Sequence, residues 1–338
     1  MSNAKQFGRT AIGDKVAVRE LPMRGRVWVT FGAVAFLWGI PYLLIRIAVD
    51  DGVPPVFVAW VRTVLGAAVL LGMAWRAHTF GGLWTRMKWL TAFAVVEIAL
   101  PYPLIAAGER HVTSSLTAIL VATAPLFVAL AALRFDATER PSRWQLAGLV
   151  LGLAGIAGLT RVDIAGRADE LHGTAAVLGA TFCYAVGPLI YKRRLADLDR
   201  RASMGASLAL AALLLAPAAA IHPPTTVPST RAIVALLILG LFCTAAALVL
   251  WGALIAQIGV GRALVVTYLN PVVAVALGMV ILGERPGMGA IASLLLILVS
   301  SWLSTDGRLP ARLGLILHRL RPQQKRSASP TPQIVRDG

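Results

Sequence analysis

Two charged residues, Arg62 and Glu97, stand inside long apolar stretches of the chain. An ionisable side chain is expensive in hydrocarbon, so each is first treated as a functional candidate. At 1.5 Å rise per residue, Arg62 would lie about 12 Å and Glu97 about 16 Å below the outer membrane surface. Adjacent antiparallel helices could bring the two side chains together. Either Glu97 binds a proton or another cation, or the two residues form a static ion pair that joins two helices.

The other candidates are uncharged side chains that need hydrogen-bond partners when buried. They are Trp38, Tyr102, Tyr184, Tyr268 and Asn270. We expect them to line a central substrate chamber together with the two charged residues, and aromatic anchoring at the membrane interface is the alternative. Pro125 and Pro271 are expected to kink their helices, because a proline within a span frees a backbone carbonyl.

Motifs for several other kinds of chemistry are missing from the sequence. It has no Walker-type phosphate loop, no His-Glu-x-x-His zinc motif and no Gly-x-Ser-x-Gly elbow. Cys183 and Cys243 lie in separate apolar runs without metal-binding spacing. We therefore expect no cofactor, no metal site and no catalytic residue, and the protein is predicted not to be an enzyme.

The composition of the chain is typical of an integral membrane protein. Of its 338 residues, 57% are hydrophobic and only 14% are charged, with a mean hydropathy of +0.74. A soluble domain has about 25% charged residues. A membrane helix needs about 20 mainly apolar residues, and ten segments qualify: 27–46, 55–75, 89–107, 113–133, 144–160, 171–191, 203–220, 231–255, 261–282 and 287–304. The predicted fold is all-α, with ten transmembrane helices.

Basic residues predict the orientation of these segments. With a cytoplasmic N-terminus, 25 of the 32 Lys and Arg residues lie on the inner side and six on the outer side. This bias follows the positive-inside rule, so both termini are predicted to be cytoplasmic in the cell (inner) membrane. The rule also explains the formal charge of +16. The lipid bilayer is therefore the expected partner of the basic loops, and no nucleic acid is expected.

The two halves of the chain resemble each other at an offset of 146 residues, which aligns Pro125 with Pro271. At an offset of 145, Glu139-Arg140-Pro141 aligns with Glu284-Arg285-Pro286. We expect each Glu-Arg pair to form a local ion pair at a helix start, where a carboxylate also suits the helix dipole. The predicted organisation is an N-terminal tail, two five-helix repeats and a basic C-terminal tail, at residues 1–26, 27–160, 171–304 and 305–338. Because each repeat has an odd number of spans, the second must be inverted.

In the order of its motifs, the chain resembles the EamA-type carriers of the drug/metabolite transporter superfamily. The matching motifs are Trp38-Gly39, Arg62, Glu109-Arg110-His111, Pro125, Glu139-Arg140-Pro141, Asn270-Pro271 and Gly283-Glu284-Arg285-Pro286. The resemblance covers residues 27–304. It implies a ten-helix bundle with a central substrate chamber, and export or exchange of amino acids, related metabolites or drugs.

Three functions are compatible with a polytopic membrane chain of this kind. A secondary carrier working by alternating access is favoured by the inverted repeat, with a small-molecule substrate, possible proton coupling and a monomeric or homodimeric state. An intramembrane enzyme acting on a lipid-linked substrate would need polar catalytic groups gathered near one interface, and the polar groups are dispersed. A sensor or assembly partner would need a sizeable soluble domain or a long loop, and the longest segments outside the spans are short tails.

Overall fold

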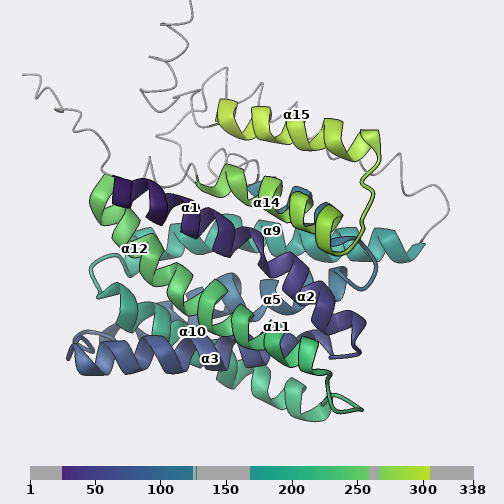
Figure 1. Cartoon of the computed structure of the whole chain (residues 1–338). Helices are drawn as coiled ribbons and strands as arrows, with labels where there is room; N and C mark the ends of the chain where they lie inside the picture. The colour runs from purple at the N-terminus through teal and green to yellow at the C-terminus, as the bar shows by residue number, and fades with distance from the viewer. Residues whose placement is uncertain (1–24, 125–126, 128–167, 259–265, 305–338) are drawn as a thin grey trace, which may run out of the picture.

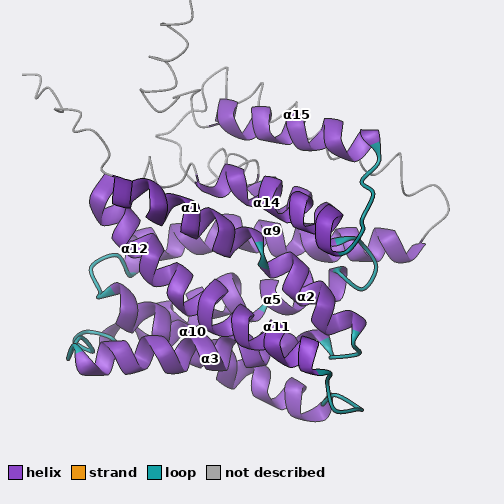
Figure 2. Ribbon diagram, viewed as in Figure 1, coloured by secondary structure: helices purple, strands orange, loops and turns teal. Residues whose placement is uncertain are grey.

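The computed structural model describes residues 25–124, 127, 168–258 and 266–304, and this part of the chain contains helices and loops but no strand (Figures 1 and 2). Six of its helical stretches are long and apolar enough to cross a membrane: Gly25–Asp50, Pro55–Arg76, Trp84–Gly108, Asp169–Arg194, Arg200–Ile221 and Thr230–Gln257. They coincide with the predicted first, second, third, sixth, seventh and eighth segments. The predicted fifth segment, 144–160, lies outside the described residues, as do residues 1–24 of the predicted N-terminal tail and the whole predicted C-terminal tail.

The first half begins with a broken helix. Its elements are α1 (Gly25–Gly39), α2 (Pro41–Asp50), α3 (Pro55–Arg76), η1 (Trp84–Arg86), α4 (Met87–Ala94), η2 (Val95–Ala99), α5 (Pro101–Gly108) and α6 (Ser114–Val121). The break falls at Ile40, because Pro41 lacks the N–H that would continue the helical ladder. α1 and α2 nevertheless run nearly end to end in Figure 1. Only the start of the predicted fourth segment, as α6, is described.

The second half contains α9 (Ala168–Arg194), α10 (Arg200–Ile221), α11 (Thr230–Gly240), η3 (Leu241–Ala246), α12 (Ala247–Ile258), α14 (Val266–Ile281) and α15 (Met288–Ser304). α14 and α15 fall within the predicted ninth and tenth segments. α15 lies at the edge of the bundle beside α14 (Figure 1).

Helices α3 and α10 pack against each other along their length and run antiparallel. A Cβ built at Gly205 would lie 3.0 Å from the backbone nitrogen of Leu71, and one built at Gly66 would lie 3.2 Å from Leu208. Residue numbers therefore fall along α3 as they rise along α10. Glycines allow the backbones to approach closely, as is usual where helices associate in membranes.

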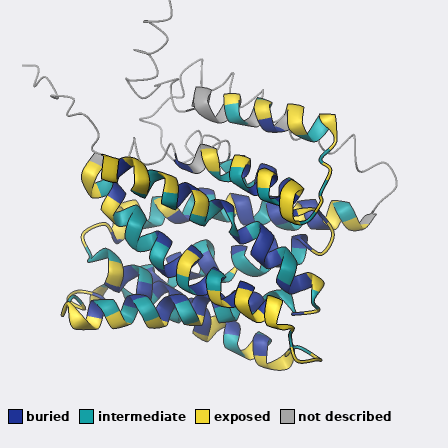
Figure 3. Cartoon of the chain, viewed as in Figure 1, coloured by how far each residue is buried: buried dark blue, intermediate teal, exposed yellow. Residues whose placement is uncertain are grey.

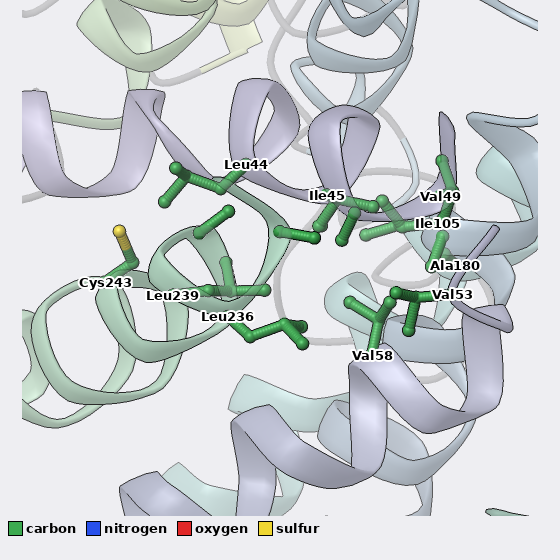
Figure 4. Close-up of a cluster of buried hydrophobic side chains, with 14 residues drawn as sticks. Leu44, Ile45, Val49, Val53, Val58, Ile105, Ala180, Leu236, Leu239 and Cys243 are labelled. Atoms are coloured by element: carbon green, nitrogen blue, oxygen red, sulfur yellow. The ribbon is translucent and has the colours of Figure 1, made fainter. Parts of the chain in front are cut away.

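The largest apolar cluster lies where α2, α3, α5, α9 and α11 meet. Figure 4 labels ten of its residues: Leu44, Ile45, Val49, Val53, Val58, Ile105, Ala180, Leu236, Leu239 and Cys243. They come from these helices, except Val53, which lies between α2 and α3, and Cys243, which belongs to η3. Buried residues face the inside of the bundle and exposed ones its periphery (Figure 3). Many of the exposed residues are large and apolar, such as Leu213 and Val280, which suits a surface that faces lipid.

Two of the helical stretches long enough to cross a membrane, Trp84–Gly108 and Thr230–Gln257, contain a π-helical segment. η2 begins at residue 95 and η3 at residue 241, which are 146 residues apart. This spacing equals the offset at which the two halves of the sequence align. π-Helical turns inside α-helices are rare and are frequent at functional sites. Both segments face α3 or its packing partner α10.

Candidate functional site

Arg62 of α3 lies at the centre of a polar cluster inside the bundle. It is buried with 9% exposure, and its Nε donates a hydrogen bond of 2.8 Å to Oγ1 of Thr244. The guanidinium carbon lies 3.9 Å from the ring centroid of Tyr102, so the cation stacks on the aromatic face. Thr244 belongs to η3 and Tyr102 to α5. Arg62 thus joins an element of the second half to two elements of the first.

The π-helical turn η3 positions the hydroxyl that holds Arg62. Thr244 Oγ1 donates at 2.9 Å to the carbonyl of Leu239, five residues earlier, while it accepts from Arg62. A hydroxyl has one donor and can accept as well, so both capacities of Thr244 are used. Thr244 is 1% exposed. The hydrogen bond to the cation is therefore shielded from solvent.

Two further tyrosines stand near Arg62. Tyr184 of α9 is within range for electrostatic interaction with Arg62, Tyr102 and Glu97. Tyr42 of α2 is within such range of both Arg62 and Glu109. Tyr184 was predicted and Tyr42 was not, although Tyr42 directly follows Pro41 at the helix break. The cluster brings together the predicted residues Arg62, Glu97, Tyr102 and Tyr184.

Glu97 lies in η2 and faces α9 instead of Arg62. Its Oε2 is buried without a hydrogen-bond partner, and a Cβ at Gly187 would clash with its carboxylate. Gly187 is therefore required for Glu97 to occupy this place. Among the ion pairs of the described residues, none joins Arg62 to Glu97, so the static pair, one of the two alternatives drawn from the sequence, is not formed in this structure. The physical reason is that Thr244 and Tyr102 hold the guanidinium on one side, while the absence of a side chain at Gly187 leaves room for the Glu97 carboxylate against α9.

Two other predicted residues lie away from Arg62. The Trp38 ring packs on Trp251 of α12, with centroids 4.9 Å apart. Asn270 of α14 has a buried Oδ1 without a hydrogen-bond partner. A Cβ at Gly39 would lie 3.1 Å from the Asn270 carbonyl and would clash with Val273. α1 and α14 therefore cross closely beside these residues. The Tyr268 side chain and Pro125 lie outside the described residues, and α14 continues through Pro271.

Glu284 does not form the predicted local ion pair with Arg285. Its Oε1 accepts hydrogen bonds of 2.9 and 2.8 Å from the N–H and hydroxyl of Ser114, and its Oε2 accepts from the N–H and hydroxyl of Ser115. These serines begin α6. The expectation of a carboxylate at a helix start is correct, but the helix belongs to the other half. The loop before α15 is thereby fixed to α6.

Glu109 is a buried acid that is absent from the predicted site. It follows α5 directly and is 0% exposed, while its neighbours Arg110 and His111 are exposed. Neither carboxyl oxygen has a hydrogen-bond partner. Burial raises the pKa of Glu109 well above its ordinary value, Arg46 lowers it in part, and Glu284 and Asp50 raise it further. Because Glu109 is followed by Arg110 and His111, the sequence resembles an exposed polar turn. Nothing in the local sequence indicates that Glu109 is buried while these two neighbours are exposed.

The fold and this cluster define a class: a multi-span helical membrane protein with a polar centre held between helices far apart in sequence. The pattern of the EamA-like transporter family matches residues 26–161 and again residues 171–305. The chain therefore belongs to the EamA-like transporter family.

Several relatives carry names of transport proteins. The chain is 29% identical to the uncharacterized inner membrane transporter YedA of Escherichia coli K12, over 78% of this chain and 84% of the relative. It is 25% identical to a probable amino-acid metabolite efflux pump of Salmonella typhimurium, over 81% and 93%. It is 27% identical to protein PagO of the same organism, over 74% and 83%.

A solved structure shares the fold. A crystal structure of a protein 19% identical in sequence superposes with a TM-score of 0.59, covering 88% of this chain and 99% of the other. At this identity the likeness concerns the fold alone.

Proposed function

We propose that this protein is a secondary active transporter that exports or exchanges a small solute across the inner membrane by alternating access. The observation that carries the proposal is the position of Arg62. This buried cation is bound to Thr244 of the second half and stacked on Tyr102 of the first. A buried charge between helices is costly, and in membrane proteins such residues mark pathways of ions or substrates.

Ten spans in two inverted repeats are part of the proposal. The family pattern occurs twice, at residues 26–161 and 171–305. Helices α3 and α10 occupy equivalent places in the halves and pack antiparallel, as an inverted pair would. The π-helical segments recur at the offset of the halves. Each half could then exchange conformations with the other, so that the polar cluster opens to one side at a time.

The chemistry of the cluster favours a solute that carries a carboxylate. An arginine guanidinium presents five N–H donors in a planar fork that matches a carboxylate. Among the described residues, only its Nε hydrogen bond to Thr244 is present. Tyrosines 42, 102 and 184 add hydroxyl groups and aromatic faces around it. Amino acids and related metabolites fit this class, and the name of the Salmonella efflux pump agrees with it.

Glu97 is proposed as the coupling residue. Its Oε2 lies buried on Gly187, and the next residue in α9 is Pro188. Proline has no N–H, so the Tyr184 carbonyl lacks its helical donor. A protonated Glu97 can supply a hydrogen to this part of α9, and an ionised one cannot. Proton binding would thereby change how η2 packs on α9, which is the link that an exchange of protons for solute requires.

The alternative of an intramembrane enzyme has less support. An enzyme acting on a lipid-linked substrate needs nucleophilic or acid–base groups near an interface where the head group lies. In the described part of the chain, no group of three or more His, Cys, Asp or Glu side chains is placed to hold a metal ion. The polar cluster around Arg62 lies between the membrane-spanning helices, away from the ends of these helices.

The test is counterflow in proteoliposomes containing the purified full-length chain, loaded with unlabelled amino acids and supplied with radiolabelled ones. Arg62→Gln should lower uptake of carboxylate-bearing solutes at least about tenfold, since a charge-assisted contact contributes about 1.5–3 kcal/mol. Arg201→Gln removes an exposed arginine of α10 and serves as the control. Uptake equal to that of empty liposomes for every amino acid and for a wider metabolite panel would refute the proposal.

A further inference from the structure

The acid that follows α5, Glu109, is left unexplained by the proposed transport site. It is 0% exposed, and both carboxyl oxygens are shielded from solvent without a hydrogen-bond donor. A buried ionised carboxylate without a donor is among the costliest arrangements in a folded protein, whereas a neutral carboxyl costs far less. Each unsatisfied buried group needs an explanation, and a bound proton is the simplest one here.

The groups that face Glu109 come from every element packed around it. Tyr42, Arg46 and Asp50 lie along one face of α2, and Glu284 precedes α15. On its own loop, Arg110 and His111 point to the exterior. α9 meets the end of α5 at Gly173, next to His172 and close to Glu170. The two facing carboxylates oppose a negative charge on Glu109, and one cation partly offsets them.

Arg46 makes a metal cation an unsuitable occupant. Its Nη1 donates to the carbonyls of Glu109 and Val112, and its Nε forms a 2.9 Å ion pair with Asp50. A sodium ion at Glu109 would need carbonyl oxygens as additional ligands. The carbonyls of Glu109 and Val112 are already bound to the Arg46 guanidinium, whose charge repels a cation. A proton bound to the carboxyl group needs no carbonyl ligands.

We propose that Glu109 is a proton-binding site at the end of the bundle where α2 stops, neutral in this conformation and ionised when the end of α5 separates from α2 and α9. This end is the outer one if the termini are cytoplasmic. When the end of α5 moves away, the carboxyl group gains water, and solvation lowers the cost of its negative charge.

A row of polar side chains connects Glu109 with the centre of the bundle. Tyr42 is in electrostatic range of Glu109 and of Arg62. Arg62 stacks on Tyr102, and Tyr102 is in range of Glu97. Protonation at one end therefore changes the field along the row. Its use in coupling rests on the proposed transport function, whereas proton binding at Glu109 does not.

The experiment is thermal and denaturant unfolding of the purified full-length protein in detergent, from about pH 4 to pH 8. Because the folded state holds a proton that the unfolded state releases near pH 4.5, wild-type stability should fall as pH rises, by up to tenfold in the unfolding equilibrium constant per pH unit. Glu109→Gln should lose this part of the pH dependence, so the variant becomes relatively more stable at high pH. The matched control is Asp169→Asn, which removes an exposed carboxylate at the start of α9.

A stability difference between wild type and Glu109→Gln that stays constant with pH would overturn the proposal. If Glu109→Gln does not fold, infrared spectra of wild type and Glu97→Gln at neutral pH decide instead. A protonated carboxyl band must survive in Glu97→Gln, and its complete loss would refute the site. A stabilisation by sodium over potassium at fixed pH that Glu109→Gln abolishes would show a metal-cation site and would equally refute it. These measurements need no substrate, so failed transport with an intact proton site would count against the proposed function alone.

Discussion

The hydrogen bond between Arg62 and Thr244 should be measurable as a coupling energy between the two halves. Arg62→Met removes the cation but keeps the apolar stem, and Thr244→Val removes the hydroxyl at nearly constant volume. A hydrogen bond to a charged group contributes about 1.5–3 kcal/mol in soluble proteins. Interactions of side chains between membrane helices average about 0.6 kcal/mol and reach about 1.7 kcal/mol. Arg62 and Thr244 are 9% and 1% exposed, so we expect a coupling near the upper limit, about 1–1.7 kcal/mol.

The assay is a double-mutant cycle of unfolding free energies for wild type, both single variants and the double variant. Thr181→Val is the matched control, since Thr181 is also fully buried but donates only to the Val177 carbonyl of its own helix. Its cycle with Arg62→Met should be additive within about 0.3–0.5 kcal/mol. A coupling for Thr244 that is no larger than this control value would refute the claim that the hydroxyl of η3 holds the cation.

Two further substitutions test the surroundings of Glu97 and of Glu284. Gly187→Ala should destabilise the protein by about 1–3 kcal/mol, because the new methyl group would clash with Glu97. The control Gly179→Ala, on the same helix, places its methyl group 3.8 Å from a side chain and should be neutral or stabilising. Equal effects of the two substitutions would contradict the close fit of Glu97 against Gly187. Glu284→Gln should lower the free energy of unfolding by about 1–3 kcal/mol, because it weakens the hydrogen bonds at the start of α6. The control Arg285→Gln, at an exposed position, should change the free energy of unfolding by no more than about 0.5 kcal/mol. If Glu284→Gln leaves thermal stability unchanged, the cap contributes nothing.

The fold class and the main polar residues could be predicted because each depends on local composition. A run of about 20 apolar residues must satisfy its backbone as a helix in lipid, whatever its neighbours are. Six predicted segments accordingly coincide with helices of sufficient length. Arg62 and Glu97 are conspicuous in the same way, since a charge in such a run stands out from its surroundings. Family membership followed from motif order, which is also a linear property.

The pairing of the polar residues could not be predicted, because it depends on how helices rotate about their axes and how closely they approach. Depth along the helix axis suggested that Arg62 and Glu97 meet. Helix rotation turned Arg62 to Thr244, and a glycine on α9 accommodated the carboxylate of Glu97. The depth of a side chain along the helix axis is a single coordinate. Whether two side chains touch also depends on how each helix is rotated about its axis and on how closely the helices approach.

The chain by itself thus determined that helices form, where most of the described crossings lie and which side chains are too polar for lipid. Only the tertiary structure decided that Glu284 caps a helix of the other half and that Glu109 is buried while its sequence neighbours are exposed. The physical reason is range: backbone satisfaction and hydrophobicity act within a segment, whereas the burial and partner of a charged group are set by residues that may be more than 100 positions away, as Ser114 is from Glu284, 170 residues along the chain.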